Sequence, residues 1–349
     1  QQFHYVPQQN FRIPIDAGRA GIVEAMLLSP DGTTLIVAGS AWDGVATAPT
    51  GYLWPRSSAS TQDWQQVGTI TVFNTVTRAC RVFRGHQGAI RQLAFVDNGK
   101  DPTQFVSLGF EYTGQKISQS VRVWSLETGQ QIGQPLPLAH TLIPPSTDIS
   151  PRIQAWQSAS NVTQVAVATW RIDGTTPVSD LMLWNPLQPG GPVKLLGAPV
   201  SLALQQSGQG LSRRLFCGGL GPAVSFLVGD GQLQTLQRVN GLLNDAIPMA
   251  AARIPATAES NAERTAVVSV RPLPNGDKDY RLSVQEGNNF RSVGAMWVNR
   301  SVAALPTATL VEPVVTASPD GRFLSVAGST QSDIRIYRIN DLLRNIQPA

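Results

Sequence analysis

The chain has 349 residues, of which 14% are charged and 42% hydrophobic, and its formal net charge is +4. It is long enough for two average domains or one large one, and for a core that needs no disulfide or metal to hold it together. The basic residues are scattered, which argues against a nucleic-acid-binding face, and no apolar run approaches the roughly 18 residues of a membrane-spanning helix.

A fourteen-residue stretch occurs twice, once near each end of the chain. Residues 27–40 read LLSPDGTTLIVAGS and residues 316–329 read TASPDGRFLSVAGS, with nine identical positions. Ser-Pro-Asp-Gly is a tight-turn sequence, because proline presets φ and glycine accepts a positive φ. Apolar residues lie on both sides of the turn, so each stretch predicts an antiparallel hairpin. Since a lone hairpin is marginal in water, a recurring one predicts units that stack on each other.

In chain order, the predicted strands fall into six degenerate copies of one four-stranded unit. The copies cover residues 22–83, 89–136, 152–197, 200–238, 247–298 and 313–339. The last copy has three strands and a helix-like tail at 339–347, while a short apolar alternation precedes the first copy. If the units form a ring, a strand at 11–15 completes the last copy and closes it. We therefore expect one domain, residues 1–349, with a long loop insertion at 41–66.

Two copies carry more specific marks. The pair Gly85-His86 stands just before a predicted strand, and Trp124 ends a third strand that is followed by a Thr-Gly turn. With the Ser-Pro-Asp-Gly hairpins, these marks resemble the WD40-repeat family of β-propellers. The resemblance implies an all-β fold, a single closed propeller of four-stranded antiparallel blades. The copies number about six, and seven is the alternative because it is the commonest number in the family.

The same resemblance implies a buried hydrogen-bond network. In the family, this network joins a histidine, a serine or threonine, an aspartate and the tryptophan. His86, Ser107 and Trp124 match three of these roles by position, whereas the aspartate position falls at Ser118. We therefore expect a structural network that lacks its carboxylate.

Few residues are candidates for catalysis or metal binding. The chain has three histidines, and no HxxxH, HExxH or CxxC spacing occurs. A Ser/His/Asp triad could assemble across the fold, but nothing marks a nucleophile elbow. The two cysteines, Cys80 and Cys217, are expected to be unpaired and to act as small core residues. We accordingly expect no catalytic residue, no metal and no cofactor.

The predicted function is a non-catalytic interaction platform or a subunit of a larger assembly, with protein partners. By the family's connection rule, the long connections 41–66, 111–119, 136–151, 171–179, 271–279 and 299–312 share one face, which would be the binding face. Large aromatics are enriched at binding hot spots. The candidate contact residues on this face are Trp42, Tyr52, Trp54, Trp64, Tyr112 and His140.

Other interpretations remain open at this stage. The aromatic rings of segment 41–66 could instead cap the propeller's own channel. The protein could also be an enzyme or a small-ligand binder that uses the central channel, which requires polar groups converging from several blades. Low charge, few lysines and a first residue other than methionine lean towards an exported, processed protein, although no compartment is assigned.

Overall fold

The computed structural model describes residues 21–42, 66–98, 101–113, 116–138, 152–158, 160–173, 176–188, 193–195, 199–206, 213–219, 224–228, 233–238, 242, 246–256, 263–275, 277–286, 289–299, 313–318, 320–327 and 334–344. Within these ranges the chain is almost entirely strand, as the sequence predicted. The strands form consecutive antiparallel sheets, which we number as blades in chain order.

The first three blades lie in the first half of the chain. The first comprises β1 (Gly21–Leu28), β2 (Thr34–Trp42), β3 (Gln66–Asn74) and β4 (Cys80–Arg84). The second comprises β5 (Ile90–Asp97), β6 (Gln104–Thr113), β7 (Lys116–Ser125) and β8 (Gln131–Leu138). The third comprises β9 (Arg152–Gln157), β10 (Thr163–Asp173), β11 (Thr176–Trp184) and β12 (Val193–Leu195).

The other blades follow in the second half. The fourth comprises β13 (Pro199–Gln206), β14 (Arg213–Gly219), β15 (Val224–Val228) and β16 (Leu233–Arg238). The fifth comprises β17 (Ile247–Ile254), β18 (Arg264–Pro272), β19 (Lys278–Glu286) and β20 (Asn289–Asn299). In the described residues the sixth has three strands, β21 (Val314–Ala317), β22 (Phe323–Ala327) and β23 (Arg335–Arg338), followed by the helix α1 (Ile339–Arg344).

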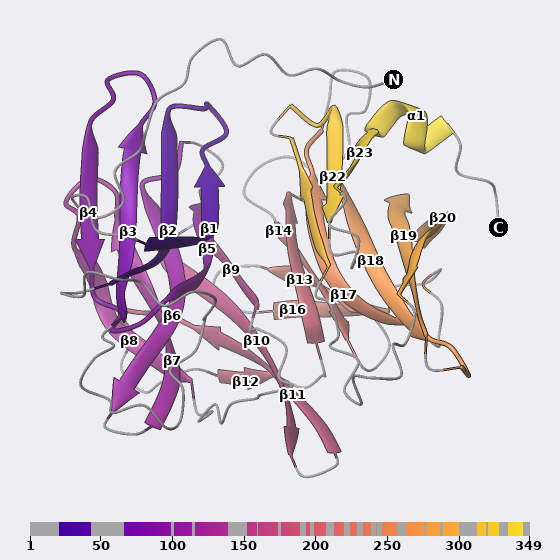
Figure 1. Ribbon diagram of the computed structural model, residues 1–349, viewed down its shortest axis with the longest axis horizontal. Helices are drawn as coiled ribbons and strands as arrows, with labels where there is room; N and C mark the ends of the chain where they lie inside the picture. The colour runs from indigo at the N-terminus through magenta and orange to yellow at the C-terminus, as the bar shows by residue number, and fades with distance from the viewer. Residues whose placement is uncertain are drawn as a thin grey trace.

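The blades follow one another around an arc, from β1–β4 to β21–β23 (Figure 1). The first strand of each blade lies beside the first strand of the next, so these strands form the inner wall. A short parallel pairing of Val96 with Ala155 and of Asp97 with Trp156 joins β5 to β9. This is the arrangement of a β-propeller, and the predicted fold class of antiparallel blades is confirmed.

The core lies between successive blades. Consecutive strand residues point to opposite faces, so Phe105 packs between the first two blades whereas its neighbour Val106 packs between the second and third. Similar apolar clusters lie between the third and fourth, fourth and fifth, and fifth and sixth blades. Helix α1 adds Ile339 and Leu342 to the last of these clusters.

The repeated turns of the first and last blades have the same structure. The Ser29 hydroxyl donates to Asp31 at 2.5 Å and accepts from the Thr34 amide at 2.9 Å. In the last blade the Ser318 hydroxyl donates to Asp320 at 2.6 Å and accepts from an amide five residues on at 2.9 Å. Both turn glycines have positive φ, 74° at residue 32 and 66° at residue 321.

Two predicted loops are in fact strand. The predicted connections 111–119 and 171–179 are mostly strand, because β6 and β7 pair as far as Thr113 with Lys116, and β10 and β11 as far as Asp173 with Thr176. The predicted insertion is also shorter than 41–66, since Trp42 pairs with Gln66 at the end of β2 and β3. Polar and small residues in these stretches suggested loops, but hydrogen bonding between paired strands overrides such preferences.

The two cysteines differ in environment. Both are free thiols, as predicted. Cys217 is buried between the third and fourth blades, and burial raises the pKa of its thiol. Cys80 is exposed, because it begins the outermost strand of the first blade. The prediction that Cys80 is a core residue is therefore wrong.

The sixth blade presents an apolar face that no described blade covers. Val314 and Ile336 are each 60% exposed there, whereas Leu324 and Val326 on the opposite face are buried against the fifth blade. No described strand pairs with the free edge of β23. The predicted closing strand at 11–15 lies outside the described residues, so ring closure and the blade count stay predictions. Among the described residues, no helix is long and apolar enough to cross a membrane.

Candidate functional site

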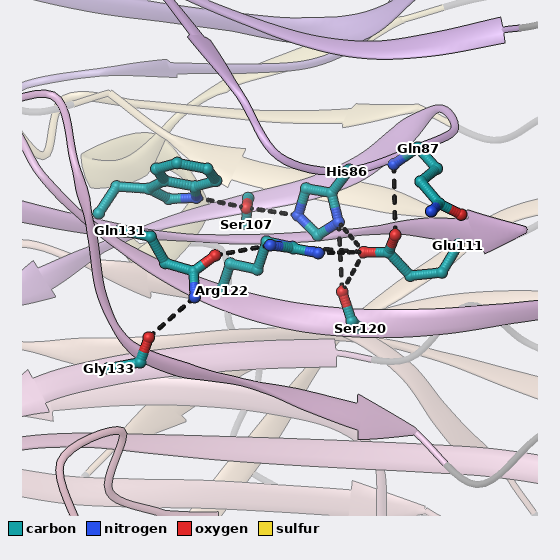
Figure 2. Close-up of polar contacts among 9 residues, drawn as sticks. His86, Gln87, Ser107, Glu111, Ser120, Arg122, Gln131 and Gly133 are labelled. Carbon is teal, nitrogen blue, oxygen red and sulfur yellow. Dashed lines mark hydrogen bonds and ion pairs between the residues drawn. The ribbon is translucent and has the colours of Figure 1, made fainter.

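A buried histidine lies at the centre of the best-connected polar network in the second blade. His86 follows β4 and precedes β5, and its ring points between Ser107 and Glu111 (Figure 2). Its Nε2 lies 2.8 Å from the Ser107 hydroxyl, which also accepts a hydrogen bond of 2.8 Å from the Trp124 indole. A Cβ at Gly109 would lie 2.7 Å from the His86 ring, so this position needs glycine.

Glu111 supplies a carboxylate to this network. Its Oε1 lies 3.0 Å from His86 Nδ1, accepts from the Ser120 hydroxyl at 2.5 Å and pairs with Arg122 at 3.0 Å (Figure 2). By the WD40 resemblance, the position of the network's aspartate falls at Ser118. Glu111 is the residue directly opposite Ser118 in the register of β6 and β7. The carboxylate thus reaches the expected place from the neighbouring strand.

The hydrogen bonds assign the protons of this network. Burial lowers the pKa of His86, so the ring is neutral near pH 7. Burial alone would raise the pKa of Glu111, but hydrogen bonds from His86 and Ser120 outweigh it and lower that pKa to about 2. A neutral ring with its proton on Nδ1 donates to Glu111, and its Nε2 then accepts from the Ser107 hydroxyl.

The order serine, histidine, carboxylate is also that of a nucleophilic triad. Ser107, however, is completely buried, and its oxygen already accepts the Trp124 indole hydrogen. The Ser107 hydroxyl is thus enclosed and already hydrogen-bonded to His86 and Trp124. These contacts tie the loop before β5 to the sheet, and a structural role for the network stays a prediction.

A second polar site lies on the inner wall. Glu24 of β1 and Arg91 of β5 both fall where the strand pairing shifts by one residue, which marks a β-bulge. Bulges re-aim side chains and are frequent beside functional sites. The two side chains form an ion pair of 2.8 Å, and the Arg91 guanidinium lies 5.4 Å from the centre of the Phe110 ring.

Within the described part of the chain, one oxygen of this pair has no hydrogen-bond partner. Glu24 Oε2 accepts from Arg91, whereas Glu24 Oε1 is buried and accepts nothing from the described residues. The Glu24 side chain is only 11% exposed. A buried carboxylate oxygen without a donor is unfavourable, because it has lost its water without replacement.

A further ion pair crosses between distant inner strands. Arg253 of β17 lies 3.2 Å from Asp97 at the end of β5, and its guanidinium also pairs with Glu263. It therefore links the second and fifth blades at the end opposite to Arg91, which stands near the start of β5. Among the described residues, no group of three or more histidine, cysteine and acidic side chains could hold a metal ion.

The structure describes only part of the predicted partner-binding set. Trp42 lies in β2 and Tyr112 in β6, each in a paired strand end. Tyr52, Trp54, Trp64 and His140 lie outside the described residues. His86, Ser107 and Trp124 are brought together in the network. Glu24 and Arg91 were missed by sequence reasoning, because no local motif marks two residues 67 positions apart that meet across blades.

No known protein family and no curated protein matches the sequence. Among solved structures, hydrazine synthase of Kuenenia stuttgartiensis is similar with a TM-score of 0.50 and 12% identity, over 98% of this chain and 82% of that chain. The periplasmic gluconolactonase of Pseudomonas aeruginosa has a TM-score of 0.44 and 14% identity, over 90% of this chain and 80% of that chain. The β-propeller domain of the trilobed protease from Pyrococcus furiosus has a TM-score of 0.43 and 11% identity, over 90% of this chain and 80% of that chain. At such identities the likeness concerns the fold alone.

These comparisons correct the functional prediction. The sequence predicted a non-catalytic platform and no enzyme activity, yet the similar fold of hydrazine synthase belongs to a protein that is an enzyme by name. That prediction is wrong, because it took the lack of a local catalytic motif as a lack of catalysis. A propeller can assemble a site from residues of several blades, and such a site leaves no motif in the sequence.

Proposed function

We propose that this protein binds a small polar ligand at the inner wall between its first and second blades, as a ligand-binding or catalytic propeller. The observation that carries the proposal is the buried Glu24 Oε1, which lacks a donor beside the Arg91 guanidinium. A ligand with a hydroxyl or N–H group would donate to this oxygen, and an anionic group on the same ligand would be attracted by Arg91.

The positions of these residues support binding rather than a purely structural ion pair. Both lie at bulges, where the chain turns a side chain away from the regular sheet. Phe110 holds the guanidinium by a cation–π contact, so Arg91 is already ordered before a ligand arrives. A preorganised charged group loses little conformational entropy on binding.

We also infer that the propeller is a divergent member of the WD40-repeat family. The contacts among His86, Ser107 and Trp124, together with the carboxylate of Glu111, support this assignment. A protein partner, membership of a larger complex and the aromatic contact set stay predictions. A ligand site on the inner wall is compatible with each of them.

A ligand screen with matched variants tests the proposed function. Amino acids, hydroxy acids and sugars are screened for a rise in the melting temperature of the protein. For any hit, Glu24→Gln and Arg91→Gln should each weaken binding by at least about tenfold, because a hydrogen bond to a charged group is lost. Calorimetric titration measures the affinities.

The control is Glu127→Gln, which makes the same chemical change at an exposed turn. This variant should bind as the unaltered protein does. A hit whose affinity is unchanged in both Glu24→Gln and Arg91→Gln would overturn the proposal, and so would a screen without any hit.

A further inference from the structure

A second buried polar cluster lies in the fifth blade, away from the inner wall site. Strands β18 and β19 lie side by side in the fifth blade (Figure 1). Their register pairs Arg271 with Asp279 and Ser269 with Arg281. Residues two apart on a strand share a face, and directly opposed residues are neighbours. These four side chains therefore share one face of the fifth blade. We call them the blade-five cluster.

The cluster contains buried acceptors without donors. Asp279 Oδ2 accepts from Arg271 at 3.1 Å and from Arg281 at 2.8 Å. The Asp279 side chain is 5% exposed, and its Oδ1 is buried without a hydrogen-bond partner among the described residues. The hydroxyl of Ser269 is buried and unpaired in the same way. Natural proteins rarely leave such groups unsatisfied, so these atoms are expected to bond to a group from outside the chain.

The charges of the cluster define what could fill it. Two guanidinium groups bind the one carboxylate of Asp279, and both arginine side chains are partly exposed. They attract an anion, and guanidinium groups suit the oxygens of phosphate. An anion without a proton, however, would meet the unpaired Asp279 Oδ1 and be repelled. Only an oxyanion that keeps a proton satisfies both the arginines and this oxygen.

We propose that the blade-five cluster binds a protonated phosphate, either inorganic hydrogen phosphate or a phosphomonoester. Its P–OH group donates to Asp279 Oδ1, and its other oxygens accept from Arg281 and from the Ser269 hydroxyl. Arg281 contacts Asp279 through Nε, and the proposal assigns its terminal nitrogens to the ligand. Sulfate, which carries no proton at neutral pH, fits the arginines but not Asp279.

The proposal is tested on the unaltered protein by comparing its affinities for phosphate and for sulfate. Calorimetric titrations at pH 6.5 and matched ionic strength compare inorganic phosphate, methyl phosphate and sulfate. We expect phosphate or methyl phosphate to bind at least about tenfold more tightly than sulfate. If only methyl phosphate binds, the site takes monoesters; if inorganic phosphate binds as well, it takes both. The proposal would be overturned if sulfate bound as tightly as the better of the two phosphates, or if neither inorganic phosphate nor methyl phosphate bound.

Variants locate the binding. Arg281→Gln should weaken phosphate binding by at least about tenfold, and Asp279→Asn should abolish the preference over sulfate, because an amide can donate to an unprotonated oxygen. Arg91→Gln removes the inner wall site and should leave phosphate binding intact, which separates this proposal from the proposed function. Arg322→Gln is the matched control at an exposed arginine. Phosphate binding that survives Arg281→Gln would place it elsewhere and refute the assignment.

Discussion

Single residues in the second blade decide how its histidine is held. His86 is neutral and donates one proton to Glu111, which remains charged because Ser120 and Arg122 also bind it. A charge that is nearly surrounded by protein is stable only with such partners. The network thus depends on Glu111 keeping its negative charge while the ring stays uncharged.

The stability of the protein should therefore fall in acid in two stages. Burial lowers the pKa of His86 below its usual 6.5, so the unfolded chain takes up this proton first and stability declines below about pH 6.5. Glu111 has a folded pKa of about 2 against an ordinary 4.5. Its contribution, roughly 2 kcal/mol after allowance for partial exposure, is complete above about pH 5 and is lost as the pH falls towards 2.

Urea unfolding of the protein and of Glu111→Gln between pH 7 and pH 3 measures this contribution. The variant should be less stable at pH 7, and the difference should shrink as the pH falls below about 4.5. Glu127→Gln, at an exposed turn, should show no such difference at any pH. A difference for Glu111→Gln that stays constant down to pH 3 would contradict the assigned charge state.

Among the elements, the short helix α1 shows how packing can stabilise a segment that is too short to form alone. A six-residue helix is far below the length that is stable in water. Ile339 and Leu342 are nevertheless buried, and they belong to the same apolar cluster as Ile254, Val284 and Leu324 of the last two blades. Burial of this apolar side, rather than helix propensity, therefore holds the tail.

Leu342→Ala should lower the free energy of unfolding by about 2–3 kcal/mol, because it leaves a cavity against the fifth and sixth blades. Chemical denaturation followed by tryptophan fluorescence measures the change. Arg344→Ala, at the exposed end of the same helix, should change stability by less than about 0.5 kcal/mol. Equal effects of the two substitutions would mean that the helix does not dock as described.

At the scale of the whole molecule, the first and last blades are the two ends of the stack. Buried apolar clusters lie between successive blades, but the outer face of the sixth blade exposes Val314 and Ile336. A free strand edge favours pairing with another strand, and an exposed apolar face favours packing against another sheet. The alternation of Phe11, Ile13 and Ile15 in the sequence predicts such a strand. We propose that residues 11–15 complete the sixth blade and close the ring.

Deletion of residues 1–16 should then lower the melting temperature by roughly 5 °C or more, because several apolar side chains lose their cover. Deletion of residues 1–8, which leaves the apolar alternation in place, is the control and should have little effect. Calorimetry measures both. A full-length melting temperature after removal of residues 1–16 would rule out closure by this strand.

Much of the fold could be read from local patterns. Proline and glycine dictate the turns at 29–32 and 318–321 through backbone sterics alone, and alternating apolar residues predict strands wherever one face is buried. The repetition of this unit predicts stacking, since no copy can bury its apolar faces by itself. The Gly85-His86 pair and Trp124 also predicted the buried hydrogen-bond network, through the resemblance to the WD40-repeat family.

The tertiary structure decided the features that depend on residues far apart in the chain. Strand register, set by pairing along whole strands, placed Glu111 opposite Ser118 and extended β6 and β7 through an expected loop. Packing of one blade on the next brought Glu24 to Arg91 and left Asp279 Oδ1 buried without a donor. A sequence records which groups exist, but their distances and their loss of water arise only when the blades stack, and these quantities define the candidate sites.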